Sequence, residues 1–222
     1  MNPALLNLDL DSDLSLAAVL KKVGNVPPER VLMYPTPGTA TEEDVIWFGS
    51  RATKRLCELI DGILVEKAMG LPESMFAFHV GSKINAVVVS KNLGFVASAD
   101  GLVWIMSGRI RIPDAAFFSW ERLPNRAWPT EPISGLSPNL AIEVRSPSNT
   151  DEEFRLKRLD YFGSGVELVW EFDHRKRTVR VDRSAEGEPQ HLQGNDVLDA
   201  GSVIPGFAMP LSELFAVLDR RG

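Results

Sequence analysis

The sequence contains a single cysteine, Cys57, among its 222 residues. One thiol cannot form a disulfide within the chain, so nothing in the sequence indicates an oxidising compartment. A free cysteine usually behaves as a small buried hydrophobic residue. We expect that role for Cys57, because its sequence context offers no convincing partner for nucleophilic chemistry.

Long apolar runs are also missing. The apolar run at 166–172 is broken by Glu167 and Glu171, and it falls well short of the roughly 20 residues that span a bilayer. Residues 1–13 are acidic and lack the basic stretch and apolar segment of a signal peptide. We therefore expect a cytoplasmic protein that has no membrane partner.

An excess of positive charge is also missing, because 30 Asp and Glu outnumber 24 Lys and Arg and the formal net charge is −6. This balance argues against a general nucleic-acid coat protein, which would be basic. It does not exclude a metal-dependent nuclease, since such a site concentrates carboxylates and its bound cations reverse the local charge. The hydrophobic fraction of 44% is ordinary for a globular protein and is enough to build a core.

The chain divides into an N-terminal extension, 1–40, and one domain, 41–222. Four prolines between positions 27 and 37 interrupt regular structure in the extension, after a short helix predicted at 14–23. Thr41 then precedes three acidic residues, a pattern typical of a helix start. The role of the extension could be packing on the core or self-association.

Two turn signals and several periodic segments predict the secondary structure of the domain. Asp61-Gly62 and Asp100-Gly101 each separate two apolar runs, which predicts two β-hairpins. Helices are predicted at 74–92, 151–162 and 211–218, and strands at 140–145, 166–172 and 178–183. This order indicates a mixed α/β (α+β) fold, with one mixed sheet flanked by helices.

Four ionisable residues lie in or beside sheet-forming sequence, or on the helix that follows it: Glu66, Asp114, Glu143 and Lys157. Glu143 lies inside an apolar strand, where a buried carboxylate costs several kcal/mol unless it is paired or bound to metal. Strict alternation leaves open that Glu143 faces solvent. The ordinary alternatives for the others are a strand-start Asp114, an exposed hairpin Glu66 and a solvated helix face for Lys157.

Together these residues have the chemistry of phosphodiester hydrolysis. Carboxylates from neighbouring strands, such as Asp114 and Glu143, can converge on one Mg²⁺, which completes its shell with water and substrate phosphate. The ion neutralises charge on the phosphodiester and makes a hydroxide nucleophile accessible. A nearby lysine, here Lys157, can orient or deprotonate the water, or hold the phosphate. We expect Mg²⁺ as the cofactor, with Mn²⁺ as a substitute.

Several motifs occur in one order between residues 58 and 182. They are the segment 58–66, then His79, then the segments 111–114 and 140–149, then Lys157 with Tyr161, and finally 165–166 and 168–170. In this order they resemble the Uma family of restriction endonucleases, within the PD-(D/E)XK nuclease superfamily. The resemblance implies a restriction-endonuclease-like fold and DNA as the partner.

The resemblance also implies roles for individual residues. Asp114 and Glu143 would be the metal ligands, and Glu66 an additional catalytic acid from the early hairpin. His79 and Arg111 are candidate substrate-binding residues, although a histidine on a largely apolar helix is more often structural. A homodimer is expected by analogy, because restriction-type enzymes often need two sites to cut both strands.

One departure from the superfamily pattern concerns its lysine. The usual lysine position, two residues after the second acid, is Arg145, which stays protonated and cannot act as a base. Lys157 on the following helix matches a migrated lysine, and Arg145 could instead contact phosphate. Two alternatives therefore remain: a nuclease fold that binds nucleic acid or a protein without cutting, and a small-molecule or nucleotide hydrolase with the same metal chemistry.

Overall fold

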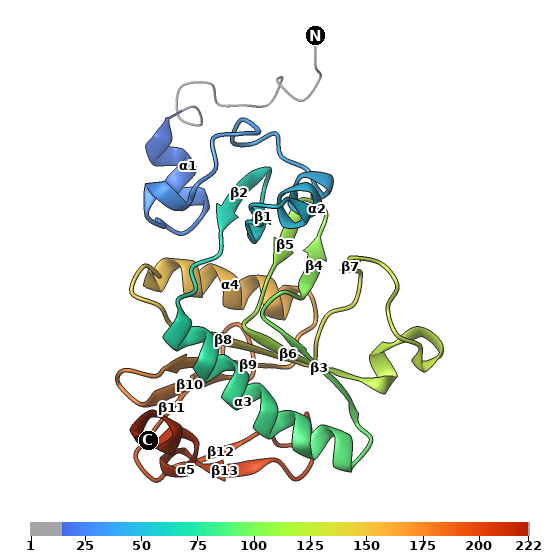
Figure 1. Cartoon of the computed structure of the whole chain (residues 1–222), viewed down its shortest axis with the longest axis vertical. Helices are drawn as coiled ribbons and strands as arrows, with labels where there is room; N and C mark the ends of the chain where they lie inside the picture. Colours follow the sequence, from blue (N-terminus) through green and yellow to red (C-terminus); the bar gives the residue numbers. More distant parts are fainter. Residues whose placement is uncertain (1–14, 222) are drawn as a thin grey trace.

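The computed structural model describes residues 15–221, so the acidic segment 1–13 lies outside the described residues. The chain forms a six-stranded sheet, a five-stranded sheet and a two-stranded ribbon, with helices packed on them (Figure 1). This arrangement confirms the mixed α/β class and corrects the expectation of one sheet. Within the described residues, no helix is long and apolar enough to cross a membrane.

The six-stranded sheet has the order β11-β10-β9-β8-β6-β3. Its strands are β3 (Gly94–Ser98), β6 (Ala115–Ser119), β8 (Leu140–Val144), β9 (Leu168–Asp173), β10 (Thr178–Asp182) and β11 (Gln190–Gln193). Only β8 and β9 among neighbouring strands of this sheet run parallel, which requires a crossover, and α4 (Asp151–Gly163) supplies it. The strands predicted at 140–145, 166–172 and 178–183 are confirmed as β8, β9 and β10.

The five-stranded sheet has the order β2-β1-β5-β4-β7. Its strands are β1 (Cys57–Ile60), β2 (Ile63–Glu66), β4 (Leu102–Met106), β5 (Arg109–Arg111) and β7 (Ile133–Ser134). The hairpin predicted at Asp61-Gly62 is confirmed, with φ of 49° and 77° at the two turn residues. Positive φ at both positions is what a two-residue type I′ turn requires.

The second predicted hairpin, at Asp100-Gly101, is wrong. A turn does form there, because the Gly101 N–H donates to the Ser98 carbonyl at 3.0 Å. The strands on either side then enter different sheets: β3 pairs with β6, whereas β4 pairs with β5. The turn therefore passes the chain from one sheet to the other instead of pairing its two arms.

Helices cover both faces of the six-stranded sheet (Figure 1). On one face, α3 (Leu71–Ser90) and the C-terminal segment bury the larger core cluster; that segment contains β12 (Val197–Asp199), β13 (Ala208–Pro210) and α5 (Leu211–Phe215). On the other face, α4 and β4 pack over β6, β8 and β9. Alternate residues of β8 therefore point to α3 and to α4, which explains why the whole strand is buried.

The N-terminal segment is packed on the domain. After α1 (Leu16–Lys22), the Arg30 guanidinium donates two hydrogen bonds to the Glu153 carboxylate on α4, at 2.7 and 2.9 Å. A small core joins this segment to the β1–β2 hairpin through Val23, Val26, Val31, Ile60, Ile63 and Val65. Thr41 caps α2 (Glu42–Ser50) as predicted. Short 3-10 turns complete the chain at Pro28–Arg30, Trp120–Arg122, Pro124–Arg126 and Ala216–Asp219.

Candidate active site

Glu143 lies in the middle of β8 and points to α4, with 3% of its surface exposed. Its Oε2 accepts a hydrogen bond from Lys157 Nζ at 3.0 Å, and its Oε1 accepts one from the Tyr161 hydroxyl at 2.5 Å. Lys157 and Tyr161 are four residues apart on α4, so they lie on the same face of the helix. The solvent-facing alternative for Glu143 is therefore excluded.

Asp114 lies just before β6 and is fixed to the neighbouring strand β8. Its backbone N–H donates to the Ile142 carbonyl at 2.8 Å, and its Oδ2 accepts from the Val144 N–H at 2.7 Å. These two bonds hold the carboxylate beside Glu143, which is the intervening residue on β8. Burial, together with the negative charges of Asp114 and Glu58, raises the pKa of Glu143 to about 7 although Lys157 opposes the shift.

A buried lysine that the sequence analysis did not single out, Lys67, faces the other oxygen of Asp114. Its Nζ lies 2.8 Å from Asp114 Oδ1, and both side chains are 4% exposed. The ammonium donates its hydrogen bonds to the carbonyls of Ile112, Pro113 and Ala99, at 2.8, 3.2 and 3.2 Å. Asp114 Oδ1 accepts no hydrogen bond from the described residues. The contact is therefore a charge pair between two buried groups.

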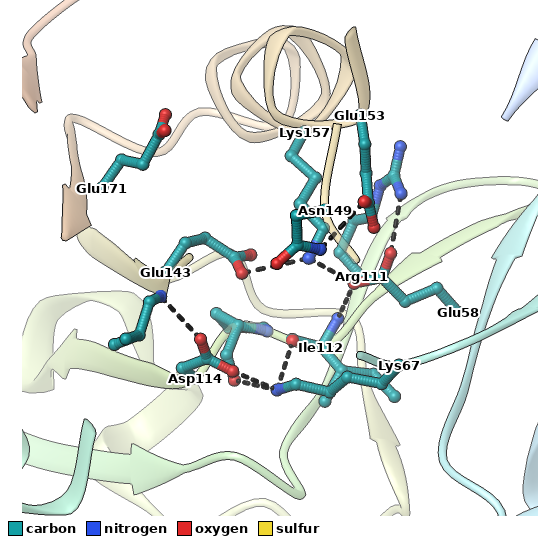
Figure 2. A network of polar contacts seen from close by, with 12 residues as sticks. Glu58, Lys67, Arg111, Ile112, Asp114, Glu143, Asn149, Glu153, Lys157 and Glu171 are labelled. Carbon is teal, nitrogen blue, oxygen red and sulfur yellow. Dashed lines mark hydrogen bonds and ion pairs between the residues drawn. The ribbon is translucent and has the colours of Figure 1, made fainter. Parts of the chain in front are cut away.

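Lys157 also contacts a second acid, Glu58 on β1. Its Nζ lies 3.1 Å from Glu58 Oε1, so Glu143 and Glu58 approach the ammonium from opposite sides (Figure 2). Arg111 donates to Glu58 Oε2 at 2.8 Å and to Asp160 at 2.7 Å. Burial acts to raise the pKa of Glu58, but Lys157 and Arg111 lower it to about 2.

Glu58 could have been found from the sequence, because it lies between apolar residues of a strand as Glu143 does. The resemblance instead predicts Glu66 as the acid from the early hairpin. Cross-strand pairing puts Glu66 opposite Cys57, whereas Glu58 pairs with Val65. Alternation then sends Glu58 and Glu66 to opposite faces of the hairpin. The structure does not bring Glu66 into the cluster; its carboxylate is partly exposed and pairs with Arg55.

The three candidate substrate-binding residues also lie apart from the acids or are enclosed. Arg111 is buried, and its guanidinium donates hydrogen bonds to two carboxylates, those of Glu58 and Asp160. Arg145 pairs with Glu171 on β9, at 2.6 Å, and with the exposed Asp151. His79 lies on α3, and burial, together with the charges of Lys83 and Arg220, lowers its pKa.

The donor set at Asp114 and Glu143 suits a hard divalent cation. Both residues offer carboxylate oxygens, which Mg²⁺ prefers, and Asp114 Oδ1 is a buried anionic atom without a hydrogen bond. Within residues 15–221 no group of three or more His, Cys, Asp or Glu side chains is arranged to hold a metal. Two carboxylates suffice for Mg²⁺, because the ion usually retains several waters.

Comparisons with known proteins agree with this fold. No curated protein matches the chain. A crystal structure described as a putative nuclease belonging to DUF820 from Anabaena variabilis ATCC 29413 has the same fold, with a TM-score of 0.67 and 21% identity. The alignment covers 78% of this chain and 96% of that one, and it confirms the restriction-endonuclease-like class. The family model Uma2, described as a putative restriction endonuclease, matches residues 45–212, about three quarters of the sequence, and the chain therefore belongs to the Uma2 family.

Proposed function

We propose that the chain is a magnesium-dependent endonuclease that hydrolyses DNA phosphodiester bonds. One observation carries the proposal: two buried carboxylates, Asp114 and Glu143, meet beside the ammonium group of Lys157. The description of the Uma2 family supports a nuclease. The acidic net charge is compatible with this activity, since a bound cation reverses the charge of the site.

Asp114 and Glu143 would hold the Mg²⁺. When bound, the ion neutralises charge on the phosphodiester and lowers the pKa of a water ligand so that hydroxide becomes accessible. Tyr161 fixes one oxygen of Glu143, and the Val144 N–H fixes one oxygen of Asp114. These two hydrogen bonds orient both carboxylates before any ligand arrives.

Lys157 acts as a cation in this proposal. Burial alone would lower its pKa, but Glu143 and Glu58 raise the pKa above the ordinary lysine value. The side chain therefore stays protonated at neutral pH and is a poor base. Of the roles expected from the sequence, orienting water or holding the phosphate fits this charge, whereas deprotonating water does not.

Glu58 is a positioning residue. Its carboxylate lies between Lys157 and Arg111, and Arg111 is in turn bonded to Asp160 on α4. These charged contacts connect the five-stranded sheet to α4, the helix that carries Lys157. Removing the Glu58 charge would loosen Lys157 while leaving Asp114 and Glu143 in place.

A cleavage assay tests the proposal. Supercoiled plasmid and single-stranded DNA are incubated with Mg²⁺ or Mn²⁺ and the wild type, Asp114→Asn, Glu143→Gln or Glu171→Gln. Glu171 is the matched control, because it is a buried acid in register with Glu143 on the next strand but pairs with Arg145 and Arg158. We expect metal-dependent cutting that Asp114→Asn and Glu143→Gln abolish and Glu171→Gln retains.

Thermal melting checks that each variant is folded. Cutting that survives both site substitutions would place the activity elsewhere. If folded wild-type protein cuts no DNA but hydrolyses bis-p-nitrophenyl phosphate, the small-molecule alternative replaces the proposal. If it does neither and still binds DNA, the chain is a binding protein with a nuclease fold.

A further inference from the structure

A cleft of about 400 Å³ lies between α3 and the edge strand β3, and Asp114 is one of the residues that line it. Its volume falls in the range of about 300–1,000 Å³ that small-ligand sites occupy. Asp114 and Glu143 themselves are almost inaccessible to solvent, because they are only 4% and 3% exposed. A substrate that follows this cleft reaches the candidate metal ligand Asp114.

Part of the wall of the cleft is built from small residues. Ala77, Gly81 and Ala115 line it, and a Cβ placed on Gly81 would lie 3.7 Å from Ala115 Cβ. Gly81 thus keeps space that an ordinary side chain would fill. The polar groups that line the cleft include Ser74, Ser82 and Asn85 along α3. These walls suit a flat group with hydrogen-bonding edges.

An aromatic ring lies at the exposed side of the same cleft. Phe78 lines the cleft and is 75% exposed, which is unusual for a large apolar side chain. No lysine or arginine occurs among the described residues that line the cleft, and its charged residues are Asp100 and Asp114. The lining itself therefore offers no cation to a phosphate, whereas a base can stack on the exposed ring.

These observations favour one substrate form. Duplex DNA is rigid, its bases are already stacked, and it is bound mainly through cationic contacts to its phosphates. A single strand can turn one base out and carry the adjoining phosphodiester into a nearly closed site. We infer that the cleft binds one unstacked nucleotide of single-stranded DNA, with its base against Phe78 and its phosphodiester toward Asp114. This inference rests on the proposed nuclease function.

Fluorescence anisotropy without divalent metal tests the inference separately from cutting. The probes are a labelled oligodeoxythymidine of about 12 nucleotides, within the site sizes of single-strand binders, and a duplex of equal length. Phe78→Ala removes the ring, and Phe78→Trp keeps a stacking surface. Met75→Ala is the matched control, because Met75 is 64% exposed one turn earlier on α3 but does not line the cleft.

We expect the wild type to bind the single strand more tightly than the duplex. Loss of the ring should weaken single-strand binding about 5- to 150-fold, the equivalent of about 1–3 kcal/mol per stacked base. Phe78→Trp and Met75→Ala should bind like the wild type. Equal affinity of Phe78→Ala and Met75→Ala would overturn the inference, as would preferential binding of the duplex.

The two proposals fail in different assays. Ring-dependent single-strand binding without metal-dependent cutting would refute the nuclease proposal and leave the binding site. Metal-dependent cutting of duplex that is indifferent to Phe78→Ala would refute the single-strand inference and leave the nuclease.

Discussion

Replacing Lys67 with methionine should destabilise the metal-free protein strongly. The substitution keeps most of the side-chain volume but removes the ammonium beside Asp114, and both groups are 4% exposed. Breaking a buried ion pair by removing one partner costs about 3–5 kcal/mol, because the remaining charge is left uncompensated. For a chain of this size each kcal/mol lowers the melting temperature by about 2–4 °C, so we expect a decrease of about 6–20 °C.

Divalent metal should reverse part of this loss. A cation that binds Asp114 replaces the missing positive charge, and a ligand that binds only the folded state stabilises it. The increase in melting temperature on adding Mg²⁺ should therefore be larger for Lys67→Met than for the wild type. Differential scanning calorimetry in EDTA and in Mg²⁺ measures both effects.

Lys54→Met is the matched control, because Lys54 pairs with Asp100 at the surface with side chains 49% and 60% exposed. An exposed pair contributes only about 0–1 kcal/mol. A double-mutant cycle with Asp114→Asn separates the Lys67–Asp114 pairing from the loss of hydrogen bonds to the three carbonyls. The charge-pair reasoning is refuted if Lys67→Met and Lys54→Met have the same melting temperature and if Mg²⁺ raises that temperature equally in both.

Three further predictions concern other parts of the chain. Tyr161→Phe removes the hydrogen bond to the Glu143 carboxylate and should cost about 1.5–3 kcal/mol in urea unfolding, whereas an unchanged midpoint would mean that the bond contributes nothing. Burial raises the pKa of Cys57 to about 12, so the native protein should resist iodoacetamide at about pH 9 and react only in denaturant. Arg30→Met removes two of the hydrogen bonds to the buried Glu153 carboxylate. Burial acts to raise the pKa of Glu153, but Arg30, together with Lys157 and Asn149, lowers it; this stabilisation is present above the unfolded pKa of about 4.3 and is lost as pH falls through the lower folded pKa. The free energy of unfolding of Arg30→Met should therefore be lower than that of the wild type at neutral pH and should decrease less steeply as the pH falls. Curves of free energy against pH that run parallel in the two proteins would contradict this.

The sequence was sufficient where a local signal and the tertiary structure agree. Asp61-Gly62 supplies both positive φ values of its turn, and Thr150 caps α4 with its own side chain. An acid inside an apolar strand correctly marked Glu143 as unusual. Its burial follows from helices on both faces of the sheet, which the sequence pattern alone leaves open.

Signals that depend on contacts between distant segments were missed. Lys67 owes its position to carbonyls 32 to 46 residues further along the chain, which no local pattern records. The choice between Glu58 and Glu66 depends on cross-strand register, since a shift of one residue exchanges the two faces. The sequence correctly predicts a turn at Asp100-Gly101, but the strands on either side of it, β3 and β4, pair with β6 and β5 in separate sheets.

The chain passes from the five-stranded sheet to the six-stranded sheet between β5 and β6. The charged residues of the site are therefore carried by two different sheets. Asp114 and Glu143 are both fixed to the six-stranded sheet, through β8. Glu58 belongs to β1, and Lys67, which follows β2, is bonded to the β1 side through Leu56. A tilt of the five-stranded sheet would consequently move the charges of Glu58 and Lys67 while the distance between the two carboxylates stayed fixed. The charge around the two acids thus depends on how the two sheets are oriented, whereas the spacing of the acids depends on the six-stranded sheet alone.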